Sequence, residues 1–190
     1  MDAFLVSAGA VAIAEIGDKT QLLAIILAAR FRQPLSIIAG IFVATLANHT
    51  LAGWVGTLIG AWLEGDRLMW VLGISFLTMA AWALIPDKAE DDDTPVERAG
   101  AFLATLIAFF LVEMGDKTQL ATIALGARFN DLPAVAMGTT LGMMIANVPA
   151  VLLGDRVLRA IPLRLVRAGA ATIFAVLGVL ALWGPVGRFF

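Results

Sequence analysis

Long apolar stretches make up most of this chain and restrict the folds that are open to it. Of its 190 residues, 61% are hydrophobic and 15% are charged, which lies outside the range of soluble domains. A helix needs about 20 mostly apolar residues to cross a bilayer. Segments that carry charges or proline divide the sequence into six such stretches, roughly 3–29, 35–62, 68–86, 98–127, 133–154 and 166–186. The sequence therefore predicts an all-α membrane protein with six transmembrane helices in a lipid bilayer.

Two almost identical charged motifs lie inside these apolar stretches. "EIGDKT" occupies 15–20 and "EMGDKT" occupies 113–118, and a shift of 98 residues aligns them together with the "QL" that follows each motif. The same shift matches Arg30 with Arg128. The chain therefore reads as two repeats of three helices, each with an E-x-G-D-K-T motif in its first helix. Because each repeat has an odd number of spans, the second repeat must insert upside down, as in many secondary transporters.

The longest polar stretch, "PDKAEDDDTPVER" at 86–98, divides the chain near its middle. We assign the segments as a first three-helix repeat at 1–86, an acidic linker at 87–97 and a second, inverted three-helix repeat at 98–190. Thr94 as an N-cap, followed by Pro95 as the first helical residue, predicts that the fourth helix begins at the end of this linker.

Basic residues are divided unequally between the two sides of the predicted bundle. The side with both termini carries three: Arg67, Arg128 and Arg188. The loops on the other side carry eight: Arg30, Arg32, Lys88, Arg98, Arg156, Arg159, Arg164 and Arg167. The positive-inside rule then places both termini outside the cytosol and the acidic linker inside it.

Composition also excludes several classes of site and partner. Cysteine is absent and histidine occurs once, so a bound metal must use oxygen ligands or that one histidine. The net charge of −2 and the lack of a basic run argue against nucleic acid as a partner. The sequence leaves open whether two copies form a homodimer.

The repeated motifs put acids and lysines where lipid would otherwise be. On a continuous helix the charged residues of each motif share one face, Glu15, Asp18 and Lys19 in the first and Glu113, Asp116 and Lys117 in the second. An ionised carboxylate at the membrane centre costs about 2.5–3.5 kcal/mol, so these side chains must face the protein interior or water. Two lysines balance two of the four carboxylates. The remaining negative charge predicts a divalent-cation site between the repeats, with the four carboxylates as metal ligands.

Other polar side chains in and near the motifs are expected to support this site: Lys19, Lys117, Gln21, Gln119, Thr20, Thr118, Asn48 and Asn147. Carboxylate, amide and hydroxyl oxygens together suit Mn²⁺, Ca²⁺ or Mg²⁺ better than zinc or copper. Clustered acids oppose one another's ionisation, so they should exchange protons as the metal arrives and leaves. Two alternatives stay open, because each threonine could bond to its own helix backbone and each asparagine could join two helices.

Three residues near the motifs have separate interpretations. His49 has no counterpart, because Val148 occupies that place in the second repeat, and we expect helix packing to satisfy it. Gly17 and Gly115 weaken the helix inside each motif and could let the backbone turn toward an ion. The sequence leaves open whether the helices break there. It also leaves open a purely structural use of the motifs, as ion pairs that hold helices together.

The duplicated motif resembles the signature of the GDT-type family, also known as uncharacterised protein family 0016. Members of that family include the Golgi transmembrane calcium and manganese transporters and bacterial manganese exporters. The resemblance covers essentially the whole chain, with its six spans, its acidic linker and the "KTQL" of each motif. It implies export of Mn²⁺, with Ca²⁺ as a second substrate, in exchange for protons through the four motif carboxylates. It also implies a location in the inner (plasma) membrane of a bacterium.

We therefore expect a secondary transporter, and not an enzyme, that works by alternating access at a four-carboxylate site near the membrane midplane. The metal is its substrate and H⁺ its coupling ion, with no catalytic cofactor. The alternatives are an exporter of amino acids or small organic cations, an intramembrane metal-dependent hydrolase, and a structural membrane protein that transports nothing. The absence of histidine from the motifs and the likeness of the two copies argue against the hydrolase.

Overall fold

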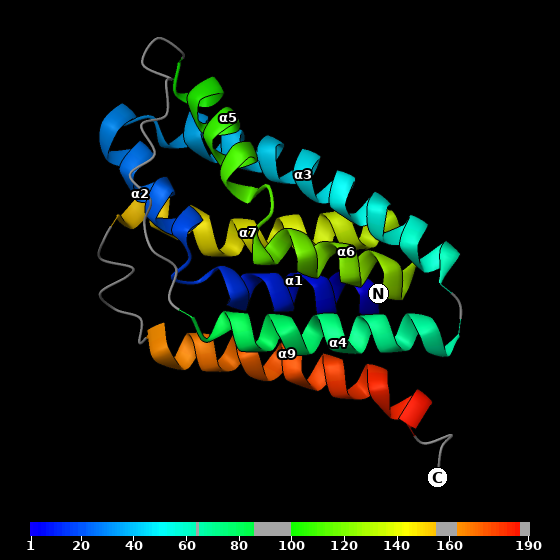
Figure 1. The fold of residues 1–190 in the computed structure, drawn as a ribbon. Helices are drawn as coiled ribbons and strands as arrows, with labels where there is room; N and C mark the ends of the chain where they lie inside the picture. The colour runs from blue at the N-terminus through cyan, green and yellow to red at the C-terminus, as the bar shows by residue number, and fades with distance from the viewer. Residues whose placement is uncertain (64, 86–99, 155–162, 187–190) are drawn as a thin grey trace.

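The computed structural model describes residues 1–63, 65–85, 100–154 and 163–186, and all regular secondary structure in these residues is α-helical (Figure 1). The helices are α1 (Asp2–Glu15), α2 (Lys19–Phe31), α3 (Pro34–Trp62), α4 (Asp66–Ala83), α5 (Ala101–Glu113), α6 (Lys117–Phe129), α7 (Leu132–Leu153) and α9 (Leu163–Val186). The predicted all-α class is therefore confirmed. The predicted linker at 87–97, with the helix start at Thr94 and Pro95, lies outside the described residues.

Three of these helices are long and apolar enough to cross a membrane, at Pro34–Trp62, Leu132–Leu153 and Arg164–Trp183. α4 has 18 residues but opens with the charged pair Asp66 and Arg67. α5 is apolar and has 13 residues, too few to span a bilayer alone. The helices thus have the character of a membrane protein with three candidate spans, and the arrangement with six spans stays a prediction.

The first and fourth predicted spans are not continuous helices. α1 ends at Glu15 and α2 begins at Lys19, while α5 ends at Glu113 and α6 begins at Lys117. The sequence left open whether the helices break at Gly17 and Gly115, and the structure shows that both do. The shared face that a continuous helix would give the acids and the lysine of each motif does not form, because the chain changes direction inside the motif (Figure 1).

A glycine in the left-handed region lies at the centre of each break. Gly17 has a φ of 80° and Gly115 a φ of 79°, a conformation that residues with a Cβ rarely adopt. The residue before each glycine is extended, with ψ values of 117° and 121°, so the helical hydrogen-bond pattern cannot continue. Asp18 and Asp116 follow in extended conformation and are the N-caps of α2 and α6. The motif sequence thus encodes a turn between two half-helices.

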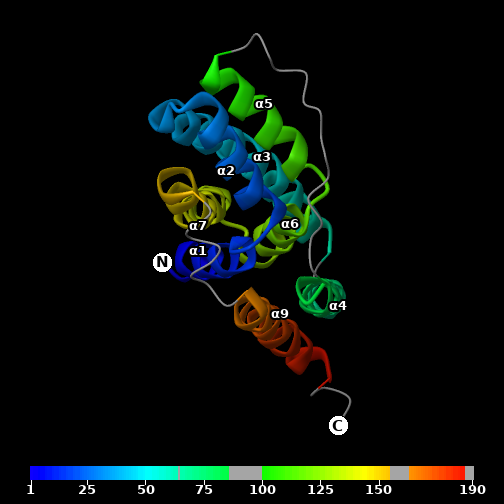
Figure 2. The ribbon, with the colours of Figure 1, turned by 90° about the vertical axis from the view of Figure 1, so that its left-hand side faces the viewer.

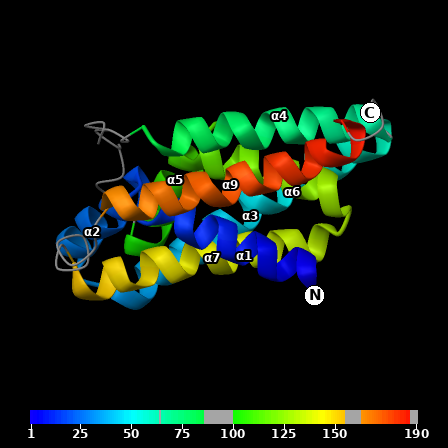
Figure 3. The ribbon, with the colours of Figure 1, turned by 90° about the horizontal axis from the view of Figure 1, so that it is seen from below.

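Corresponding helices of the two halves run in opposite directions along the bundle (Figure 1). α3 and α7 are antiparallel, as are α4 and α9, and α1–α2 runs opposite to α5–α6. Seen from one end, α4 and α9 lie together at one edge of the bundle, with α9 beside α1 and α4 beside α6 (Figure 2). From below, α9 lies between α4 and α1 (Figure 3). Phe76 of α4 and Phe174 of α9 are stacked, with ring centroids 6.4 Å apart.

The long helix of each half packs along the broken helix of the other half. α3 contacts α5 and α6, and α7 contacts α1 and α2. Glycines allow the close approach, because a Cβ on Gly60 would lie 2.6 Å from the carbonyl oxygen of Ala127, and one on Gly142 would lie 2.6 Å from that of Ala8. This exchange of partners holds the two breaks against each other in the core of the bundle.

Candidate metal centre

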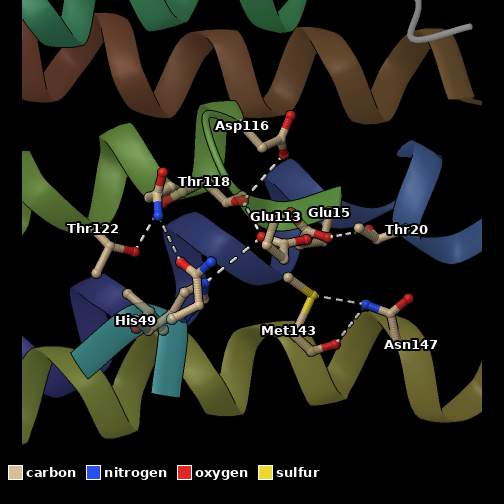
Figure 4. Close-up of polar contacts among 12 residues, drawn as sticks. Glu15, Thr20, His49, Glu113, Asp116, Thr118, Thr122, Met143 and Asn147 are labelled. Atoms are coloured by element: carbon tan, nitrogen blue, oxygen red, sulfur yellow. Dashed lines mark hydrogen bonds and ion pairs between the residues drawn. The ribbon is translucent and has the colours of Figure 1, made fainter. Parts of the chain in front are cut away.

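The two breaks bring the four acids of the motifs into the protein interior, and Figure 4 shows three of them, Glu15, Glu113 and Asp116. Glu15 and Glu113, the last residues of α1 and α5, have no exposed surface. Asp18 is 1% exposed and Asp116 is 3% exposed. All four predicted carboxylates are therefore buried, so none of them is a solvated surface group.

Three of these carboxylates form a cluster. One carboxylate oxygen each from Glu15, Glu113 and Asp116 can be chosen so that all lie within 4.8 Å of one another. Donor atoms about 2.1–2.4 Å from one cation are separated by roughly 3–4.8 Å, so these three can bind a single ion. Oε1 of Glu15 and Oε1 of Glu113 are buried and have no hydrogen-bond partner among the described residues. Both atoms are free to bind a cation.

The fourth acid, Asp18, lies outside this cluster and forms an ion pair across the two motifs. Its Oδ1 is 2.7 Å from Nζ of Lys117, and the reciprocal pair joins Lys19 Nζ to Asp116 Oδ1 at 3.3 Å. Each lysine thus contacts an acid of the opposite motif. The two pairs differ in exposure, because the side chain of Lys19 is 32% exposed whereas that of Lys117 is 6% exposed.

The motif threonines donate hydrogen bonds to the glutamates and not to their own helix backbone. Oγ1 of Thr20 donates to Oε2 of Glu15 at 2.7 Å, and Oγ1 of Thr118 donates to Oε2 of Glu113 at 3.0 Å. Thr118 also lies 3.3 Å from Oδ2 of Asp116. Each threonine therefore fixes one oxygen of a glutamate while the other oxygen still faces the cluster.

The motif glutamines tie each break to the long helix of the other half. The backbone N–H groups of Gly17 and Gly115 donate to the side-chain oxygens of Gln21 and Gln119, at 2.8 and 2.7 Å. The side-chain nitrogen of Gln21 donates to the carbonyl of Ala146 on α7 at 2.9 Å. That of Gln119 donates to Oδ1 of Asn48 on α3 at 3.0 Å. The glutamines hold the breaks in place, and their use as metal ligands stays a prediction.

The paired asparagines have different surroundings, although they occupy matching positions. Asn48 accepts the bond from Gln119 described above and is 1% exposed. Asn147 is fully buried and donates from Nδ2 to the carbonyl oxygen of Met143 at 3.1 Å and to its sulfur at 2.9 Å. Asn48 is therefore linked to a motif of the site, whereas Asn147 bonds within its own helix.

His49 is the residue whose surroundings the sequence did not indicate. Its side chain is fully buried, and neither ring nitrogen has a hydrogen-bond partner among the described residues. The expectation that helix packing satisfies this histidine is therefore wrong. Nε2 lies 3.9 Å from Oε2 of Glu113 (Figure 4). The only signal available in the sequence was its place next to Asn48.

The arrangement has the chemistry of a cation site inside a membrane-type helical protein. Carboxylate oxygens from two chain breaks converge in the protein interior, and two lysines pair with two of the four acids. A site of this kind at the junction of broken helices is typical of secondary transporters.

The comparison with protein families gives the same class. The family model described as "Divalent cation/proton antiporter GDT1" matches residues 3–91 and 101–188. The chain belongs to this family, as its motifs suggested.

Individual relatives cover nearly the same length. A protein of Vibrio cholerae serotype O1 named "Putative manganese exporter" is 51% identical over 180 residues, which is 94% of this chain and 90% of the relative. GDT1-like protein 3 of Oryza sativa subsp. indica is 28% identical over all of this chain and 74% of its own. GDT1-like protein sll0615 of Synechocystis is 26% identical over 93% of this chain and 94% of its own. No solved structure gives a significant match.

The buried ion pair of the site generates a stability prediction. Asp18→Asn should destabilise the protein by about 3–5 kcal/mol, because it leaves the charge of Lys117 buried without its partner. Replacing both residues, as Asp18→Asn with Lys117→Met, should cost less than the single change. Chemical unfolding in detergent micelles measures both values.

Asp2→Asn is the matched control, since Asp2 is exposed. If the double variant were no more stable than Asp18→Asn, the unpaired charge of Lys117 would not be the cause of the lost stability.

Proposed function

We propose that this protein exports a divalent cation, Mn²⁺ with Ca²⁺ as a second substrate, in exchange for protons. The observation that carries the proposal is the carboxylate cluster. Glu15, Glu113 and Asp116 come from two motifs 98 residues apart, yet their oxygens lie within 4.8 Å of one another in the core. Membership of a divalent cation/proton antiporter family supports the class of transport. The choice of manganese rests on the name of the Vibrio relative, because oxygen ligands alone accept either ion.

The proposed topology has six spans in two inverted repeats. α1–α2 and α5–α6 each cross once as a pair of half-helices, and α3, α4, α7 and α9 each cross once. The opposite directions of corresponding helices support the inversion (Figure 1). Together the half-helices of each pair have 27 and 26 residues, since α1 has 14 and the other three have 13 each. A pair is therefore long enough to cross a bilayer.

In the proposed mechanism the cation and the lysines compete for the same carboxylates. Lys19 pairs with Asp116 and Lys117 pairs with Asp18, and in this mechanism these pairs form whenever the cation is absent. An arriving cation binds Glu15, Glu113 and Asp116 and displaces the lysines. Asp18, released from Lys117, then joins the site as the fourth carboxylate. When the cation leaves, protons replace it, because several ionised acids in one buried cluster repel one another. Exchange of metal for protons follows from this shared site.

Alternating access requires that the two sides open in turn. The Lys19–Asp116 pair is partly exposed, whereas the Lys117–Asp18 pair is buried. We take these pairs as the two gates of the site. The partly exposed Lys19–Asp116 pair is the looser gate, and the buried Lys117–Asp18 pair is the closed one. Rocking of one repeat against the other would then open the second pair and close the first.

We further propose that the protein lies in the inner membrane of a bacterium with both termini outside the cytosol. The chain has no cysteine, so single cysteines can report sidedness. Asp2→Cys should react with a membrane-impermeant maleimide on intact spheroplasts, and Gln33→Cys, in the exposed connection between α2 and α3, only after permeabilisation. The reverse pattern would invert the proposed orientation.

Flux in proteoliposomes tests the transport function itself. The purified protein should move Mn²⁺ when a pH gradient is imposed, and reversing the gradient should reverse the net flux. Glu15→Gln should lower this flux at least about tenfold, because it removes one ligand of the cluster. A fluorescent metal indicator inside the vesicles measures the metal, and a pH-sensitive dye measures the counter-flow of protons.

Asp2→Asn serves again as the control, and it should transport at the rate of the unmodified protein. If the Mn²⁺ flux were the same with and without a pH gradient, exchange for protons would be ruled out. The absence of metal flux under either gradient, with movement of an amino acid or organic cation instead, would replace divalent-cation export altogether.

A further inference from the structure

The single histidine of the chain stands against the carboxylate cluster. His49 lies in the middle of α3, in the first half, and its Nε2 faces Oε2 of Glu113 from the second half at 3.9 Å (Figure 4). The side chain has no exposed surface. Nδ1 and Nε2 are both without a hydrogen-bond partner in the part of the chain that the structure describes.

A buried imidazole without partners needs an explanation, because burying an unpaired polar group is costly. The distance to Glu113 is too long for a hydrogen bond. It does fit the spacing of roughly 3–4.8 Å between two donor atoms on one cation. Oε1 of the same glutamate is also unpartnered. Both side chains therefore hold donor atoms that no hydrogen bond uses among the described residues.

Of the three acids in the cluster, Glu113 is the one that His49 approaches. His49 is not part of the set of three donors that already lie within 4.8 Å of one another. An ion held by His49 and all three acids together therefore requires one of these side chains to move. In the other half Val148 occupies the matching position and offers no donor. The two halves can thus supply one nitrogen ligand between them.

We propose that His49 is a nitrogen ligand of the transported cation and that it makes the site prefer Mn²⁺ to Ca²⁺ and Mg²⁺. This inference rests on the proposed function, since it concerns the same cation site. Imidazole nitrogen suits first-row transition metals, whereas Ca²⁺ and Mg²⁺ take oxygen ligands almost exclusively. The carboxylates then supply general affinity for divalent cations, and His49 supplies the discrimination between them.

Pulsed electron paramagnetic resonance of bound Mn²⁺ tests this directly. Because His49 is the only histidine, growth with ¹⁵N-histidine labels a single side chain, provided that the purification tag contains no histidine. The Mn²⁺ spectrum of the full-length protein should show a nitrogen coupling that changes from the ¹⁴N to the ¹⁵N pattern on labelling. This comparison needs no substitution, so it does not depend on a variant that folds.

Competition measurements give the second readout. His49→Gln should weaken Mn²⁺ binding about 10-fold or more while Ca²⁺ binding changes less than about twofold, so the preference for Mn²⁺ falls. Thr45→Val is the matched control, because Thr45 lies one turn earlier on α3, is equally buried and also lacks a hydrogen-bond partner among the described residues. It should leave both affinities unchanged.

The outcomes separate this inference from the proposed function. Bound Mn²⁺ without any coupling to the labelled histidine would overturn the role of His49 and leave the carboxylate site standing. Equal losses of Mn²⁺ and Ca²⁺ affinity in His49→Gln would also overturn it, since that result indicates only structural support. Failure of the unmodified protein to bind Mn²⁺ would overturn the proposed function, and the inference with it.

Discussion

The burial of four carboxylates in an apolar bundle is the constraint on which the rest of the structure depends. Such groups are stable there only when cations or hydrogen-bond donors compensate them. Each half of the chain supplies part of this compensation to the other, because Lys19 pairs with Asp116 and Lys117 pairs with Asp18. The compensation is incomplete, since Oε1 of Glu15 has no partner among the described residues. A folded state that leaves charge to be balanced is suited to binding and releasing a cation.

The sequence predicted the burial of the motif acids better than their arrangement. Hydrophobic composition and the duplicated motif were enough to predict an all-α membrane protein, and the burial of the acids followed from the cost of charge in lipid. The break at Gly17 could not be derived, because glycine inside a helix is common and only the structure shows the positive φ. Without the break, periodicity placed Glu15 and Lys19 on one face, and the pairing between motifs was missed. The six-span inverted arrangement stays a prediction that the opposed helix directions support.

The two halves are alike in sequence but not equivalent in structure. Thr20 and Thr118 each donate a hydrogen bond to the glutamate of their own motif. In contrast, Asn48 accepts a bond from a motif glutamine, whereas Asn147 bonds within its own helix. His49 against Val148 is the strongest difference, because only one side of the cluster has a nitrogen donor. A comparison of the two repeats identifies residues that recur, and His49 does not recur, because Val148 occupies its place in the second repeat. A repeat that has diverged at one buried position can acquire selectivity there without losing the shared carboxylate site.

If the two motifs build one cation site between them, as we propose, the stoichiometry of Mn²⁺ binding tests this most directly. Equilibrium dialysis of the purified protein, with Glu15→Gln and Glu113→Gln as variants, counts the bound ions. We expect one Mn²⁺ per chain, and loss of binding when either glutamate is replaced, because each motif would supply ligands to the same ion. Two bound ions per chain, or one ion retained in each variant, would show that the motifs bind cations independently and would contradict the account.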